Sequence, residues 1–104
     1  MKGESALVTR ILLALRKQGA TAIKIHGSVY SRKGEPDIIG CYQGMSFAME
    51  VKLDYNKPTI IQQVRLREWL KSGARTAVVR SVDEAVRAAI KGEEVNHHEF
   101  EIQK

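Results

Sequence analysis

The chain has 104 residues, 43% of them hydrophobic, which suits one small domain with a single modest core. Its only cysteine, Cys41, excludes an intrachain disulfide framework and is expected to be a buried thiol, and no Cys/His grouping has zinc-finger spacing. The net charge of +5 and an isoelectric point near 9.6 favour a folded domain whose partners are polyanions.

Residues 4–18 are predicted to form an amphipathic helix that ends at Gly19. Apolar side chains recur there at a spacing of four, at Leu7, Ile11 and Leu15. The segment superficially resembles a signal peptide, but Arg10 and Arg16 interrupt its apolar run and no small-residue cleavage site follows. No apolar run approaches the ~20 residues that cross a bilayer. We therefore expect a cytoplasmic protein of bacterial or viral origin with no membrane partner.

The middle of the chain predicts three strands, over residues 21–26, 37–42 and 45–52. Gln43 and Gly44 supply a two-residue turn, so the second and third strands are expected to form a hairpin. The loop before this hairpin is rich in glycine, serine and basic residues.

A helix over 59–72, a buried strand over 75–80 and a helix that follows Ser81 complete the pattern. The order α-β-β-β-α-β-α predicts an α/β fold in which helices cover a mixed sheet. We expect one domain over residues 1–92. Phe100 and Ile102 alternate with polar residues, so the tail over 93–104 is expected to add an edge strand or to contact a partner.

The hairpin contains an unusual set of charges. Its two-residue turn pairs Tyr42 with Met45, which places Asp37 roughly opposite Glu50, and cross-strand neighbours lie ~5 Å apart. Lys52 shares a face with Glu50 because strand side chains alternate in direction. Two adjacent carboxylates repel each other and resist ionisation unless something offsets their charge.

A divalent cation is one way to offset that charge. Mg²⁺ prefers hard oxygen ligands and usually takes one or two protein carboxylates, which leaves positions for water and phosphate. Lys52 would then hold or help to deprotonate an attacking water, or neutralise charge on phosphorus. This chemistry is metal-assisted phosphodiester hydrolysis. The alternative is a set of ordinary surface charges at a strand end, with Lys52 forming a simple salt bridge.

The stretch "GEPDIIG…AMEVK" resembles the PD-(D/E)XK nuclease signature, and more closely its VRR-NUC branch. The resemblance extends to "ESALVTRILLALRKQG", "KIHGSVYSRKGEPD" and "KPTIIQQVRLREWLKSGARTAVVRSVDEA", and so covers about residues 4–90. It implies a restriction-endonuclease-like core. The tail has no counterpart in this pattern.

The resemblance implies a role for each matching position. Asp37 and Glu50 would be ligands of Mg²⁺ or Mn²⁺, together with the backbone carbonyl of Val51. Lys52 would be the catalytic lysine, and Glu4 would be an accessory acid and metal ligand. An acid in the first turn of a helix is also favoured by the helix dipole alone, so Glu4 has a structural alternative.

Gln62 would be the helix glutamine near the site, with Gln63 as the less favoured choice. Gln62 has a structural alternative, because it lies three residues after Thr59 and can form a capping box instead. Those two roles conflict, since a side chain folded back on the cap does not face a metal. Glu35 departs from the family pattern, in which a less acidic residue usually precedes the proline; it would tune metal affinity or face solvent.

The loop before the hairpin is the candidate nucleic-acid contact, because a basic segment with an aromatic residue suits phosphate groups beside a cleavage site. Its residues are His26, Ser28, Tyr30, Ser31, Arg32 and Lys33. An ordinary solvated loop is the alternative. Trp69 shares an apolar face of the 59–72 helix with Leu66 and Leu70, so it is expected in the protein core and not as a stacking platform for bases.

These expectations combine into a Mg²⁺- or Mn²⁺-dependent DNA endonuclease that acts on branched or structured duplex, like Holliday-junction resolvases. A junction offers two strands to cut, so a twofold homodimer is expected. Two alternatives remain open at this point. One is a non-catalytic nucleic-acid-binding module or a nuclease subunit that acts with a partner, and the other is a metal-free interaction domain with a salt-bridged hairpin.

Overall fold

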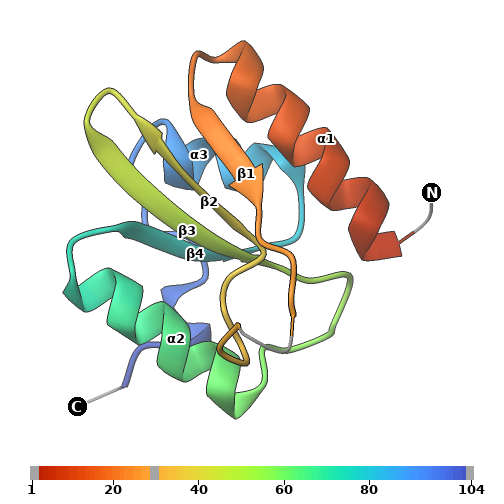
Figure 1. Ribbon diagram of the computed structural model, residues 1–104, viewed down its shortest axis with the longest axis vertical. Helices are drawn as coiled ribbons and strands as arrows, with labels where there is room; N and C mark the ends of the chain where they lie inside the picture. The colour runs from red at the N-terminus through yellow and green to blue at the C-terminus, as the bar shows by residue number, and fades with distance from the viewer. Residues whose placement is uncertain (1–2, 29–30, 103–104) are drawn as a thin grey trace.

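The computed structural model describes residues 3–28 and 31–102 and is built around one four-stranded sheet in the order β1-β2-β3-β4 (Figure 1). The strands are β1 Thr21–Lys24, β2 Ile38–Tyr42, β3 Met45–Val51 and β4 Arg75–Val79. The first three strands are antiparallel neighbours, and β4 lies parallel to β3. The mixed sheet predicted from the sequence is therefore confirmed.

The β2–β3 hairpin has the predicted register, in which Tyr42 pairs with Met45. Gln43 and Gly44 both have positive φ, of 48° and 83°, as a tight hairpin turn of this length requires. The last pair of the ladder is Ile38 with Met49. The residues just beyond it, Asp37 and Glu50, are consequently brought opposite each other.

Three helices cover the sheet: α1 Gly3–Lys17, α2 Ile60–Lys71 and α3 Val82–Ala89. α1 and α3 pack together on one face, and α2 covers part of the other (Figure 1). The main core lies between the sheet and the α1/α3 layer, and it includes the predicted stripe of α1. None of the described helices is both long and apolar enough to cross a membrane.

The tail does not form the extended edge strand that was expected. Among its described residues, Val95 makes one isolated bridge to Ala77, and a short 3-10 helix, η1, follows at His97–Glu99. Phe100 is only 1% exposed and packs with Leu66 of α2 and Val78 of β4. Burial of the Phe100 ring against α2 thus favours a compact turn over a strand.

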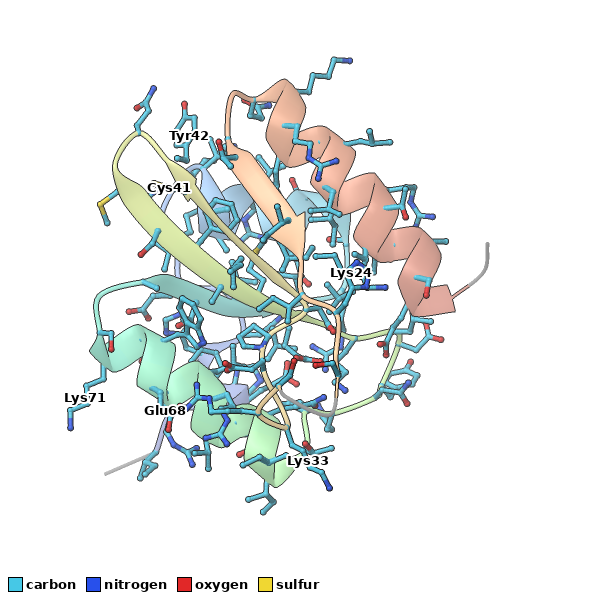
Figure 2. The ribbon with its side chains drawn as sticks, viewed as in Figure 1. Lys24, Lys33, Cys41, Tyr42, Glu68 and Lys71 are labelled. Atoms are coloured by element: carbon cyan, nitrogen blue, oxygen red, sulfur yellow. The ribbon has the colours of Figure 1, made fainter. Side chains whose placement is uncertain are left out.

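Cys41 is exposed, so the expectation of a buried thiol is wrong. It lies near the turn of the hairpin, where its strand partners Thr21 and Ser46 are also exposed. Figure 2 shows Cys41 and Tyr42 together at this end of the sheet, away from Lys33. Trp69 is half-buried and does not belong to the core clusters.

Candidate metal centre

The open end of the hairpin brings two carboxyl groups together. Asp37 precedes β2, and its Oδ2 accepts a hydrogen bond of 2.8 Å from the backbone N–H of Val51. Glu50 is 1% exposed, and its Oε1 is buried without a hydrogen-bond partner among the described residues. Burying a carboxylate oxygen with no hydrogen-bond donor lowers the stability of the fold, and a bound cation would offset that cost. Glu50 therefore has the property expected of a metal ligand.

Lys52 completes the charged set. Its Nζ lies 3.6 Å from Oε2 of Glu50, and both side chains are largely shielded from water, at 12% and 2% exposed. In the parallel register Glu50 stands beside Val78, which packs on α2, so Glu50 and Lys52 face the α2 side of the sheet. The predicted common face of these two residues is thereby observed.

Burial raises the pKa of the Glu50 carboxyl to about 9, and the neighbouring Asp37 carboxylate adds to this shift. The ammonium group of Lys52 opposes it, and the charge of Glu4 contributes a further small increase. With no cation bound, Glu50 therefore holds its proton at neutral pH. A divalent cation between the acids would favour the ionised form instead.

The hydrogen bonding of the Val51 backbone depends on the residue opposite it on the neighbouring strand. The register of the hairpin, continued two residues beyond Ile38 and Met49, places Pro36 opposite Val51. Proline has no N–H, so it cannot donate a ladder bond to the carbonyl of Val51. The N–H of Val51 is bound to Asp37, and a role for its carbonyl oxygen as a metal ligand stays a prediction.

Glu4 lies in the first turn of α1 and is half-buried. The negative charge of Glu4 contributes to the raised pKa of Glu50. However, no group of three or more His, Cys, Asp or Glu side chains is gathered closely enough to hold a metal ion anywhere in residues 3–28 and 31–102. The two hairpin acids are thus the centre of the candidate site, and direct ligation by Glu4 stays a prediction.

Gln62 forms the capping box that was its structural alternative. Its Oε1 accepts from the backbone N–H of Thr59 at 2.9 Å, and the Thr59 hydroxyl accepts from the N–H of Gln62 at 3.2 Å. The amide of Gln63 donates to the carbonyl of Pro58 at 3.1 Å. Both glutamines are therefore engaged with the backbone at the start of α2, and a role for Gln62 at the metal stays a prediction that requires it to leave the cap.

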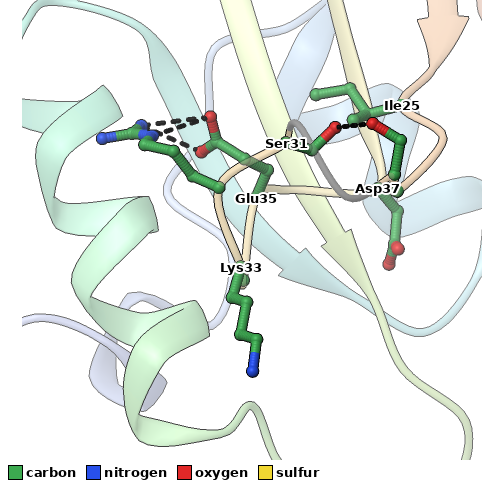
Figure 3. A pocket seen from close by; sticks show the side chains of 9 residues that line it. Ile25, Ser31, Lys33, Glu35 and Asp37 are labelled. Atoms are coloured by element: carbon green, nitrogen blue, oxygen red, sulfur yellow. Dashed lines mark hydrogen bonds and ion pairs between the residues drawn. The ribbon is translucent and has the colours of Figure 1, made fainter.

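The predicted nucleic-acid loop borders a cavity of about 280 Å³ beside Asp37 (Figure 3). Four of the predicted residues line this cavity: Ser28, Ser31, Arg32 and Lys33. His26 is exposed and is not among the lining residues, and Tyr30 lies outside the described residues. The Lys33 side chain extends away from the cavity in Figure 3.

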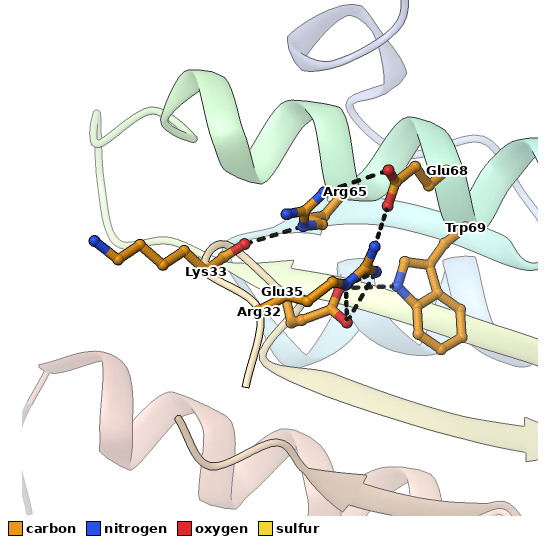
Figure 4. A network of polar contacts seen from close by, with 6 residues as sticks. All are labelled: Arg32, Lys33, Glu35, Arg65, Glu68 and Trp69. Carbon is orange, nitrogen blue, oxygen red and sulfur yellow. Dashed lines mark hydrogen bonds and ion pairs between the residues drawn. The ribbon is translucent and has the colours of Figure 1, made fainter. Parts of the chain in front are cut away.

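A polar network ties this loop to α2 (Figure 4). Arg32 pairs with Glu35 at 3.0 Å and with Glu68 at 3.1 Å. Trp69 donates a long hydrogen bond of 3.4 Å from Nε1 to Glu35, and the guanidinium of Arg65 donates to the carbonyl of Lys33 at 3.0 Å. These contacts fix the segment that leads into Pro36 and Asp37.

Sequence reasoning missed this network. Glu35 had a signal, since it departs from the family pattern, and Arg32 lies only three residues before it. However, the α2 partners of these two residues, Trp69 and Glu68, lie more than 30 residues further along the chain. The separation means that local spacing could not pair Glu35 with Trp69 or Arg32 with Glu68. Arg32 is also already paired with two acids, so a DNA phosphate would have to compete with them.

No protein-family model matches this sequence, and no curated protein matches it. Among solved structures the chain is similar to Hjc, a Holliday junction resolvase from the archaeal hyperthermophile Archaeoglobus fulgidus, with 23% identity and a TM-score of 0.62 over 74% of this chain and 67% of that one. A structure described as a VRR_NUC domain matches with 24% identity and a TM-score of 0.68, over 81% of this chain and 90% of the other. A VRR_NUC domain protein matches with 17% identity and a TM-score of 0.65, over 98% and 100% of the two chains.

These similarities define the class of fold. The chain has the mixed four-stranded sheet and three flanking helices that VRR_NUC domains and the archaeal resolvase share. The restriction-endonuclease-like core predicted from the hairpin motif is therefore confirmed as a fold. At these identities the likeness does not extend beyond the fold.

Proposed function

We propose that this chain is a divalent-metal-dependent DNA endonuclease. The observation that supports it best is the buried, unpartnered Oε1 of Glu50 beside the Asp37 carboxylate, with the Lys52 ammonium 3.6 Å from the other oxygen. A structural hairpin has no need for an orphaned buried acid, because leaving one unsatisfied costs stability. The shared fold with VRR_NUC domains and a resolvase supports the same function.

The residues fit a hard divalent cation. Asp37, Glu50 and the carbonyl of Val51 would hold Mg²⁺ or Mn²⁺, which favour oxygen ligands and keep waters of their own. When bound, such an ion supplies an acidified water and electrostatic stabilisation at phosphorus. Glu4 is the candidate accessory acid.

The protein's own groups would do the rest. Lys52 lies beside the acids and would orient or deprotonate the attacking water, or stabilise the negative charge that develops on the phosphate. The N–H of Val51 fixes the Asp37 carboxylate, so its oxygens are held before substrate binds. The basic loop over residues 26–33 would hold the DNA backbone next to the cut.

The substrate is proposed to be branched or structured duplex, cut by a homodimer. The resolvase among its structural neighbours is described as acting on Holliday junctions. A twofold dimer would present two sites to the two strands of such a junction.

The proposal is tested by incubating the purified protein with four-way junctions, flaps, single strands and linear duplex in Mg²⁺, Mn²⁺ or EDTA. We expect metal-dependent cutting of at least one branched substrate. Glu50→Gln and Lys52→Ala should each lower cutting by 10²-fold or more and keep DNA binding. Absence of metal-dependent cleavage of every substrate, at high protein and low salt, would overturn the proposal.

A second candidate is a non-catalytic nucleic-acid-binding module that delivers a partner enzyme. The observation in its favour is that no cluster of three metal-binding side chains occurs within the described parts of the chain. A Mn²⁺ titration followed by calorimetry separates the two candidates. Binding that Asp37→Asn abolishes supports the nuclease, and no binding supports the module.

A further inference from the structure

The loop that follows Lys52 presents a tyrosine to solvent. Tyr55 is 93% exposed, which is unusual for so large an aromatic side chain. It lies three residues after Lys52, so the two Cα atoms are at most about 11 Å apart. The loop that carries this ring therefore starts at the end of β3 where the acid pair lies.

The loop is held firmly on both sides of the tyrosine. Arg80 donates from Nε to the carbonyl of Asp54 at 2.9 Å and from Nη2 to the carbonyl of Asn56 at 2.8 Å. Asn56 in turn donates its N–H to the carbonyl of Leu53 at 2.9 Å, closing a tight turn. Asp54 adopts a left-handed backbone with φ of 47°, a conformation that side chains other than glycine adopt infrequently.

Arg80 is itself fixed by the tail and by the sheet. Glu99, whose side chain is only 5% exposed, accepts two hydrogen bonds from its guanidinium, at 2.6 and 2.7 Å. Arg80 directly follows Val79, whose carbonyl accepts from the N–H of Lys52 at 3.0 Å. Arg80, which holds the tyrosine loop, thus lies at the end of β4 that is bonded to Lys52 beside the acid pair.

An exposed aromatic ring on a loop whose backbone is held in place suits one kind of partner in a basic protein. Nucleobases stack on aromatic side chains regardless of sequence, and a loop whose backbone is already held loses less entropy on binding. Bases within duplex DNA are stacked on each other, whereas an unpaired base next to a branch offers a free face. The net charge of +5 favours DNA over a neutral or basic protein surface.

We propose that Tyr55 is a stacking platform for an unpaired base beside the cut site, and that the Arg80–Glu99 pair positions it. The inference rests on the proposed function because it places DNA at the acid pair. It assigns the preference for structured DNA to this ring. It also gives the tail a role, since Glu99 belongs to the tail.

The test uses a forked duplex that carries fluorescent 2-aminopurine at its first unpaired base, with Ca²⁺ in place of Mg²⁺ so that the DNA is bound without being cut. The wild type should change the fluorescence on binding, and Tyr55→Phe should retain that change. Tyr55→Ala should lose it and should bind the fork roughly 5- to 150-fold more weakly, while affinity for linear duplex of the same sequence is unchanged. Leu13→Ala, which removes another exposed apolar side chain from α1, is the matched control and should behave like the wild type.

Two outcomes would overturn the inference. In one, Tyr55→Ala binds the fork as tightly as the wild type and with the same fluorescence change. In the other, Tyr55→Ala leaves the fluorescence change intact but converts a dimer into a monomer in light scattering, which would assign the ring to a second copy of the chain. Thermal melting of each variant checks that it is folded.

A parallel cleavage assay in Mn²⁺ separates this inference from the proposed nuclease. Cutting by the wild type together with unchanged fork binding by Tyr55→Ala would reject the platform and keep the nuclease. Stacking without any cutting would reject the nuclease and keep the platform. Absence of all DNA binding would reject both.

Discussion

At the scale of single residues, Glu50 determines how the site responds to pH. Its folded-state pKa of about 9 lies above the ordinary value of 4.5 because the carboxyl is buried beside another acid. Between these two values the folded chain keeps a proton that the unfolded chain has released. The contribution of Glu50 to the free energy of unfolding is therefore fully present below pH 4.5 and is lost as the pH rises towards 9.

This predicts that in EDTA the free energy of unfolding falls between pH 5 and pH 9, by an amount on the order of a few kcal/mol. Glu50→Gln has no proton to lose, so its urea midpoint should be higher than that of the wild type at pH 8 and closer to it at pH 5. Addition of Mn²⁺ at pH 8 should raise the melting temperature of the wild type and not of Glu50→Gln. Identical pH profiles for the two proteins would contradict this account of Glu50.

The residue set at the acid pair could be predicted from the sequence because it depends on local rules. Strand alternation and a two-residue turn are enough to bring Asp37, Glu50 and Lys52 together. The burial of Glu50 could not be predicted, since it depends on α2 covering that face of the sheet. The sequence allows Gln62 either to face the metal or to form a capping box with Thr59, and the structure shows the capping box.

At the scale of elements, the loop before β2 is held by α2 and not by its own sequence. The helices and strands agree with the predicted ones to within about two residues because each has its own periodicity and end signals. The contacts of Glu35 with Trp69 and of Arg32 with Glu68 have no such local signal. They depend on how α2 crosses the sheet.

Loss of the Glu35 carboxylate should loosen this loop without unfolding the domain. In Glu35→Gln we expect trypsin to cut faster after Arg32 and Lys33, and we expect DNA cleavage to fall roughly tenfold or more, because Asp37 follows two residues later. The free energy of unfolding should change by less than about 1 kcal/mol, as for other partly exposed ion pairs. Glu94→Gln, at an exposed position, is the matched control; an equal gain in trypsin sensitivity in both variants would contradict the role of Glu35.

At the scale of the whole molecule, the described part of the tail packs against β4 and α2. The sequence predicted a boundary at residue 92, because Gly92 ends the last predicted helix and the residues that follow are acidic at first. In the structure the tail runs beside the edge strand β4, where Asn96 donates to the carbonyl of Val78 at 2.8 Å and the His97 ring contacts the carbonyl of Thr76 at 2.7 Å. A packing role of this kind is invisible to periodicity because one buried aromatic in a short segment has no repeat.

Phe100→Ala should therefore destabilise the entire domain. Its ring is 1% exposed between Leu66 and Val78, and removing a buried phenyl ring costs about 3–5 kcal/mol through lost burial and the cavity left behind. Urea unfolding should show a single transition at a lower midpoint, because α2 and the tail form one cooperative unit. His98→Ala, at an exposed position in the same segment, should leave the midpoint unchanged, and an equally small effect of Phe100→Ala would favour a domain boundary at residue 92.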